Sequence, residues 1–163
     1  MLFLSRLFSE PAFLFDGIEG GKMYFLKTEQ SFDSAHFLAG YNGKCRNIHG
    51  HRWTIKMEVC GKNLENEGHL RGMLVDFGDI KRELKELADY FDHSLIVEKG
   101  SMREVTLNLL KEDGFRVIEI DFRPTAENFS KYIFDYFKEK GLNVKKVTVY
   151  ETPNNCATYR EEI

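Results

Sequence analysis

Alternating apolar and polar residues predict two strands in the first third of the chain. The run from Met23 to Phe32 alternates roughly and is rich in residues that favour strands. From His51 to Cys60 one face is apolar and the other polar, the apolar face being formed by Trp53, Ile55, Met57 and Val59. Residues 39–50 have the glycine, asparagine and lysine content of a loop. We therefore expect a long hairpin with an elaborate tip.

Apolar residues at helical spacing predict two main helices later in the chain. The first begins after Asp76, a suitable N-cap, and carries a stripe formed by Ile80, Leu84, Leu87 and Phe91. The second opens at Pro124 and Thr125 and ends near Gly141. Glu127 lies in its first turn, where a negative charge is favourable.

The remaining segments complete the pattern of an α+β domain. A strand leads up to Glu151 through Val144, Val147 and Val149, and residues 156–160 form a last short strand. Residues 102–112 have a weaker helical pattern, and residues 115–120 alternate like a short strand. The order strand-strand-helix-insert-helix-strand-strand predicts helices on one face of a sheet.

Bulk properties describe one ordinary globular domain. The chain has 163 residues, with 42% hydrophobic and 30% charged residues. The net charge is −3 and no long basic block exists, so the electrostatic footprint of a nucleic-acid binder is missing. The three cysteines cannot all pair with one another, and without a secretory signal this favours reduced thiols in the cytoplasm.

The first 22 residues are apolar but fit neither a signal peptide nor a membrane span. Charged residues and a proline interrupt them, and no small-residue cleavage site follows. A docking arm or an upstream start codon explains them, and Met23 is in the second case the natural beginning. We therefore divide the chain into an N-terminal extension, or start artefact, at residues 1–22 and a single domain at residues 23–163.

Three histidines form the strongest chemical signal. His49 and His51 open a predicted strand at positions i and i+2, so both imidazoles point to the same face. His36 lies at the far end of the preceding strand, and the intervening loop brings it back beside them. Three neutral imidazoles with an open fourth position are typical of a catalytic zinc site. A chance His-x-His pair is the alternative that spacing alone leaves open.

Cys45 and the Asp92–His93 pair are the second group of candidates. From spacing, Cys45 is a fourth zinc ligand, a buried thiol or a proton-transfer group, and Lys44, Arg46 and a nearby Zn²⁺ would favour its thiolate. Asp92 can fix the tautomer of His93 and raise its basicity. The alternative is that His93 only caps a helix C-terminus.

Six motifs in order along residues 23 to about 160 resemble the 6-pyruvoyl-tetrahydropterin synthase superfamily. They are Phe32-Asp33-Ser34-Ala35-His36, Cys45-Arg46-Asn47-Ile48-His49-Gly50-His51, Val75-Asp76-Phe77-Gly78, Phe91-Asp92-His93, Pro124-Thr125-Ala126-Glu127-Asn128 and Tyr150-Glu151-Thr152. The gap between the cysteine and His-Gly-His is similar to that of the bacterial 6-carboxy-tetrahydropterin synthases of the queuosine pathway. A 6-pyruvoyl branch places the cysteine farther away, and a folate-linked branch carries a glutamate instead.

The resemblance implies the tunnelling fold, a four-stranded antiparallel sheet with two main helices packed on one face. An inserted helix and short strand are expected at about 98–123. It also implies a cytoplasmic homohexamer, a dimer of trimers with sites at subunit interfaces, and Zn²⁺ as the cofactor. The implied reaction converts 7,8-dihydroneopterin triphosphate to 6-carboxy-5,6,7,8-tetrahydropterin, acetaldehyde and triphosphate.

The resemblance further assigns roles to single residues. By position, zinc is bound by His36, His49 and His51. Cys45 is the proton acceptor, the relay is formed by Asp92 and His93, and the pterin is anchored by Glu151, with Thr125 and Glu127 near its ring.

The basic residues Lys44, Arg46 and Arg52 are candidates for the triphosphate, unless they form only a solvated loop face. Three other functions compete with the implied one. A synthase that makes the 6-pyruvoyl product is the alternative within the family. A zinc hydrolase would need a carboxylate base beside the metal. A non-enzymatic zinc-binding module would bind metal and turn over no pterin.

Overall fold

A long antiparallel hairpin forms the centre of the molecule. The computed structural model describes residues 22–162, and in it β1 (Tyr24–His36) pairs with β2 (His49–Gly61) along their whole length. Both strands run past the predicted ends, to the His36–His49 pair. The apolar alternation stops earlier because polar Ser34 and His36 take the inward positions at this end, although backbone pairing continues. Of the segment at residues 1–22 that we treated separately, residues 1–21 lie outside the described residues.

Two helices cover one face of the sheet, as the pattern predicted. They are α1 (Phe77–Phe91) and α3 (Ala126–Glu139). Asp76 caps α1, its carboxylate accepting from the backbone N–H of Gly78 at 2.6 Å. The α3 cap is Thr125, whose hydroxyl accepts from the N–H of Asn128 at 3.4 Å. Their apolar stripes and the inward residues of the strands form one core, whose largest fully buried side chains include Trp53, Phe32, Phe91, Phe129 and Phe137.

The sheet has six strands and is mixed, so the expected four-stranded antiparallel sheet is wrong. The strand order is β4-β3-β1-β2-β5-β6. On one side, β5 (Val144–Thr152) and β6 (Asn155–Arg160) continue the antiparallel hairpin pattern. On the other side, β3 (Ser94–Glu98) runs parallel to β1 over three residue pairs, and β4 (Val117–Ile120) runs parallel to β3.

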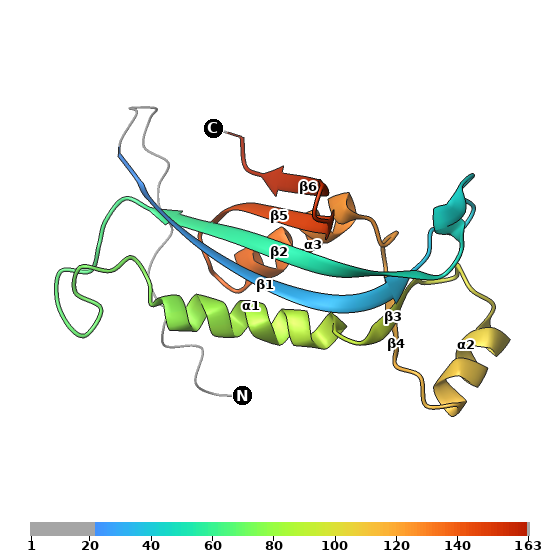
Figure 1. Cartoon of the computed structure of the whole chain (residues 1–163). Coiled ribbons are helices and arrows are strands. Elements are labelled where there is room, and N and C mark those ends of the chain that lie inside the picture. The colour runs from blue at the N-terminus through green and yellow to red at the C-terminus, as the bar shows by residue number, and fades with distance from the viewer. Residues whose placement is uncertain (1–21, 163) are drawn as a thin grey trace.

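The insert contains the expected helix and short strand. The helix is α2 (Glu104–Glu112), which crosses from β3 to β4, and such a crossover makes two neighbouring strands parallel. The strand that the pattern missed is β3, because its apolar residues follow the end of α1 directly and form too short a run to show alternation. The hairpin tip and the insert lie at the same end of the sheet (Figure 1). Among the described residues, no helix is long and apolar enough to cross a membrane.

Candidate metal centre

The hairpin register brings the three histidines together. His36 at the end of β1 lies opposite His49 at the start of β2, and His51 follows two residues later. One ligand atom from each lies within 4.8 Å of the others. All three lie on the helix-covered face, and the ring centroid of His36 is 5.0 Å from that of Trp53. The cluster is therefore a polar end of the hydrophobic core.

Backbone carbonyls fix the orientation of two of the imidazoles. The Nδ1 of His36 lies 2.8 Å from the carbonyl oxygen of Pro124, and the Nδ1 of His49 lies 2.8 Å from that of Asn47. A carbonyl oxygen only accepts, so each Nδ1 carries the proton and each Nε2 keeps its lone pair. In most metal-binding histidines, the ring nitrogen that does not bind the metal donates its proton to a carbonyl or carboxylate in this way. The Nε2 atoms of His36, His49 and His51 are buried and have no hydrogen-bond partner.

Burial favours the neutral form of His36 and His51. It lowers the pKa of His36 from 6.5 to about 4, against the contact with Pro124, which raises it, while the neighbouring His49 and His51 lower it further. Burial also lowers the pKa of His51, with Glu151 acting in the opposite direction. Only the neutral form of an imidazole can bind a metal ion, so these shifts favour metal binding at neutral pH.

Glu151 brings a negative charge to the same point. Its Oε1 lies 3.5 Å from the Nε2 of His36 and 3.7 Å from the Nε2 of His51. Since His36 is neutral with its proton on Nδ1, this contact is not an ion pair: two acceptors face each other with no proton between them. Buried acceptors without partners are costly, and a cation at this point would satisfy them. The donor set therefore fits a metal ion such as Zn²⁺.

A cavity opens beside this cluster. It has a volume of about 450 Å³, and its lining includes His51, Arg52, Lys56, Tyr150 and Glu151. The Nζ of Lys56 lies 4.8 Å from the centroid of the Tyr150 ring. Of the basic residues expected near a triphosphate, Arg52 lines the cavity, whereas Lys44 and Arg46 lie in the short 3-10 helix η1 (Lys44–Arg46) at the hairpin tip.

Cys45 lies in η1 and is half-buried. Its backbone carbonyl accepts from the N–H of Leu38 at 2.8 Å, which ties η1 to the end of β1. The cluster of metal-ligand atoms that the described residues form contains the three histidines and not this thiol.

The Asp92–His93 pair forms at the end of α1. The Nδ1 of His93 lies 2.7 Å from the Oδ2 of Asp92, and the backbone N–H of Asp33 donates to the Oδ1 of Asp92 at 2.8 Å. The Asp33 N–H, followed by the contact with His93, lowers the pKa of Asp92. Among residues 22–162, no hydrogen bond or ion pair joins this pair to the histidine cluster or to Cys45.

The N-terminus of α3 adjoins the histidine cluster. Thr125 follows directly after Pro124, whose carbonyl holds His36, and Glu127 lies exposed in the first turn. The turn after β5 is closed by the hydroxyl of Thr152, which accepts from the N–H of Asn155 at 3.1 Å. The side chain that caps this turn is thus Thr152 and not its neighbour Glu151.

Comparison with known proteins identifies the family. The sequence profile of the 6-pyruvoyl tetrahydropterin synthase family matches residues 25–162. The chain belongs to this family. It is similar to the 6-carboxy-5,6,7,8-tetrahydropterin synthase of Haemophilus influenzae, with 34% identity over 142 residues, which cover 85% of this chain and 100% of the relative. Its identity to the enzyme of the same name from Rickettsia bellii is 33%, over 76% of this chain and 90% of the relative.

Solved structures share the fold of this family member. An uncharacterized protein from Wolinella succinogenes superimposes with a TM-score of 0.71 at 16% identity, covering 87% of this chain and 100% of the other. The 6-pyruvoyl tetrahydropterin synthase of Plasmodium vivax gives a TM-score of 0.68 at 22% identity, covering 87% and 99%. The expected family is thus confirmed, and so is its class, a lyase.

Several contacts of this synthase-family site have no signal in the sequence. The carbonyls of Pro124 and Asn47 orient imidazoles, but any residue supplies a carbonyl. Lys56 and Tyr150 line the cavity, yet each resembles an ordinary outward-facing strand residue. The one indication in the sequence is the alternation of the strand, which places Arg52, Thr54 and Lys56 on the same face.

Proposed function

We propose that this protein converts 7,8-dihydroneopterin triphosphate and water to 6-carboxy-5,6,7,8-tetrahydropterin, acetaldehyde and triphosphate, as a step of queuosine biosynthesis. The names of the similar bacterial synthases support this reaction. The observation that carries it is the cluster of three buried, unpartnered Nε2 atoms facing Glu151 at the rim of a cavity. A neutral His₃ set with a further position free fits a catalytic zinc ion.

His36, His49 and His51 would hold the Zn²⁺. When bound, the metal supplies Lewis acidity that makes the hydroxyl-bearing carbons of the substrate side chain easier to deprotonate. The chain's part is to present three neutral nitrogens and to keep them in place, which the Pro124 and Asn47 carbonyls do. Water is excluded on the core side, because His36 is 0% exposed.

Glu151 anchors the pterin in this proposal. A carboxylate forms paired, charge-assisted hydrogen bonds with the guanidine-like edge of a pterin ring. Its side chain is 30% exposed and lines the cavity, so a ligand can reach it. Thr125 and Glu127 lie near the ring from the side of α3, next to the Pro124 that holds His36.

Cys45 and the Asp92–His93 pair move protons. Cys45 takes a proton as the base, and Asp92 keeps the Nδ1 proton of His93 in place so that Nε2 faces solvent and substrate. No direct contact joins the two groups within residues 22–162. In this proposal a second copy of the chain completes the site at a subunit interface, as the family resemblance implies.

The free sheet edges support the assembly. Among residues 22–162, β3 pairs only with residues 34–36 of β1, so the rest of that edge of β1 has no strand partner there, and β6 is the opposite edge strand. Exposed edges are normally paired or covered. We propose a homohexamer, a dimer of trimers whose sheets join at these edges. Light scattering should give the mass of six chains, and a stable, active monomer would contradict the assembly.

Arg52 and Lys56 supply positive charge for the triphosphate at the cavity, and Lys44 and Arg46 supply it at the hairpin tip.

All three cysteines are free, which agrees with a cytoplasmic enzyme.

The test is turnover by the zinc-loaded protein. Incubation with 7,8-dihydroneopterin triphosphate, followed by ultraviolet absorbance and product mass, should show the 6-carboxy product and acetaldehyde in equal amounts. A 6-pyruvoyl product would favour the other branch of the family. Stoichiometric zinc with no change in the pterin would make the protein a non-enzymatic zinc-binding module.

A further inference from the structure

His93 is held in an unusual backbone conformation at the end of α1. Its φ is 51°, in the left-handed region, and it is the one non-glycine residue between 22 and 162 with a positive φ. Such a conformation persists only where surrounding contacts hold it. The side chain is 81% exposed, so little packs against the ring. The direction of the imidazole therefore depends on the backbone beneath it and on Asp92.

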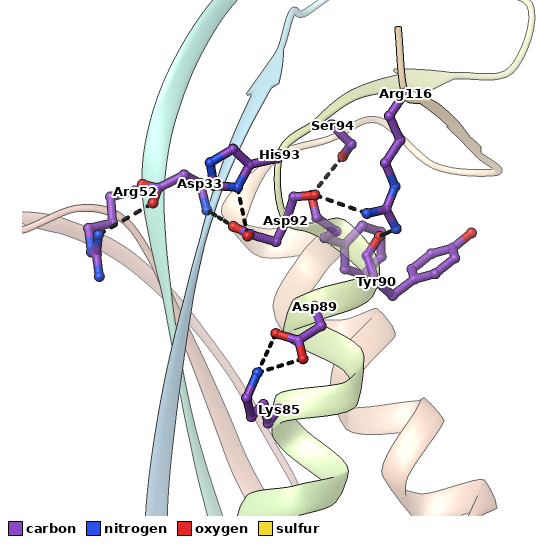
Figure 2. A network of polar contacts seen from close by, with 10 residues as sticks. Asp33, Arg52, Lys85, Asp89, Tyr90, Asp92, His93, Ser94 and Arg116 are labelled. Carbon is purple, nitrogen blue, oxygen red and sulfur yellow. Dashed lines mark hydrogen bonds and ion pairs between the residues drawn. The ribbon is translucent and has the colours of Figure 1, made fainter. Parts of the chain in front are cut away.

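Strand β1 supplies one set of holding contacts. The carbonyl of Asp33 accepts from the backbone N–H of His93 at 2.7 Å, and the N–H of Asp33 donates to the Oδ1 of Asp92 at 2.8 Å. The Oδ2 of Asp92 then holds the Nδ1 of His93 at 2.7 Å. Figure 2 shows the pair fastened to β1 in this way.

Arg116, from the insert, supplies the other set. Its Nη1 donates to the carbonyl of Asp92 at 3.2 Å, and its Nη2 donates to the carbonyl of Tyr90 at 2.7 Å (Figure 2). The Asp92 carbonyl belongs to the peptide bond that joins Asp92 to His93. The φ angle of His93 is the rotation about the bond between the nitrogen of this peptide and the Cα of His93. Holding the Asp92 oxygen therefore fixes the peptide plane on one side of the strained bond.

The C-terminal end of α1 favours a nearby positive charge. The last carbonyls of a helix lack intrahelical partners and bear a partial negative charge. The last turn of α1 has no basic residue. Arg116 provides the charge from just before β4, and its own carbonyl accepts from the N–H of Leu95 at 2.8 Å. The backbone of Arg116 is thus held against β3, and from this position its guanidinium reaches the carbonyls at the end of α1.

We propose that Arg116 is a positioning residue for His93. By binding the carbonyls of Tyr90 and Asp92, it keeps the Asp92–His93 peptide turned so that the imidazole stays on the carboxylate of Asp92 and presents Nε2 outward. The insert therefore serves the proton relay. The proposal rests on the proposed function for the relay role of His93, but the geometry that it assigns to Arg116 is measurable without turnover.

The test compares two variants with a control from the same insert. Arg116→Met removes both contacts, and Arg116→Lys keeps the charge and a donor. Lys111→Met removes a 2.7 Å ion pair with Glu119 and leaves the end of α1 untouched. The first readout is the ring ¹⁵N spectrum of histidine-labelled protein, which contains five histidines, with the His93 signals assigned by His93→Gln. The second is kcat and KM with 7,8-dihydroneopterin triphosphate.

We expect Arg116→Met to move the His93 signals from the Nδ1–H tautomer towards the mixture of a free histidine. A small displacement of a catalytic group should lower kcat by about ten- to a hundredfold, with KM within about twofold because Arg116 does not bind substrate. Arg116→Lys should restore most of both, and Lys111→Met should match the wild type. If Arg116→Met does not fold, Arg116→Gln, which keeps donors without the charge, takes its place and should show an intermediate spectrum.

Two results separate the positioning role from the reaction. If the His93 spectrum and kcat of Arg116→Met equal those of Lys111→Met, Arg116 does not position His93. If the spectrum shifts as expected but the wild-type protein turns over no pterin, the positioning stands and the proposed function fails.

Discussion

Replacing His36 with asparagine should make the free energy of unfolding of the metal-free protein depend less on pH between 6.5 and 4. His36 is 0% exposed, and burial lowers its pKa from 6.5 to about 4. Between these two pH values the folded protein keeps the imidazole neutral, whereas the unfolded chain protonates it. The unfolded state then binds more protons, so the free energy of unfolding falls as the pH drops from 6.5 to 4.

The size of the effect follows from the shift. One pKa unit corresponds to about 1.4 kcal/mol, so the fall from 6.5 to about 4 should cost about 3 kcal/mol of stability across this window. Asparagine does not titrate, and its amide N–H can replace the Nδ1–H that contacts Pro124. The variant should therefore lose most of the slope. A smaller slope of the same sign should remain, because burial also lowers the pKa of His51.

Urea unfolding in the presence of a chelator, at a series of pH values from 4 to 7.5, measures both profiles. Asp92 does not affect the comparison, because its pKa is lowered from 3.8 in both proteins and the small loss of its contribution near pH 4 is the same in each. The comparison is between slopes, so a constant loss of stability from the substitution does not matter. Equal slopes for the wild type and His36→Asn would refute the view that His36 is buried in its neutral form.

Three further predictions concern the proposed site. Zinc analysis of His49→Ala should show far less than one equivalent, whereas full retention would mean that the ligand set is wrong. Cys45→Ala should keep its zinc and lose most turnover, whereas loss of metal with activity would indicate a closed structural site. Glu151→Gln should weaken binding of a pterin ligand by about 1.5–3 kcal/mol, measured by calorimetry, while zinc content stays the same. An unchanged dissociation constant with a lowered melting temperature would instead give Glu151 a structural role.

The central hairpin could be predicted because its residues alternate in one register over a long run. With Trp53, Ile55 and Met57 facing the core, the position of His51 on the same face follows by counting in twos. His36 follows from pairing the strands around the tip. Which histidines meet could therefore be predicted from the sequence, because this depends on the alternation and pairing of the two strands.

The insert and the contacts that orient the site could not be predicted in the same way. The strand β3 has five residues and joins the sheet through parallel pairing, which depends on how α2 crosses over and not on local alternation. The Pro124 carbonyl reaches His36 across 88 positions, and nothing in the chemistry of a proline marks it. Arg116 resembles any surface arginine until the end of α1 lies beside it.

The candidate site has two parts. One part extends the hydrophobic core, and the other lies in η1 and at the exposed end of α1. The proposed metal ligands extend the inward face of β1 and β2, with His36 and His51 at 5.0 and 5.7 Å from the ring of Trp53, so their geometry is set by core packing. The proposed proton-transfer groups lie on η1 and at the end of α1, where hydrogen bonds from Leu38, Asp33 and Arg116 hold these segments. Core substitutions should therefore disturb metal content first. Substitutions in the insert should leave the metal in place and slow the proton transfer, which makes the two parts separable by experiment.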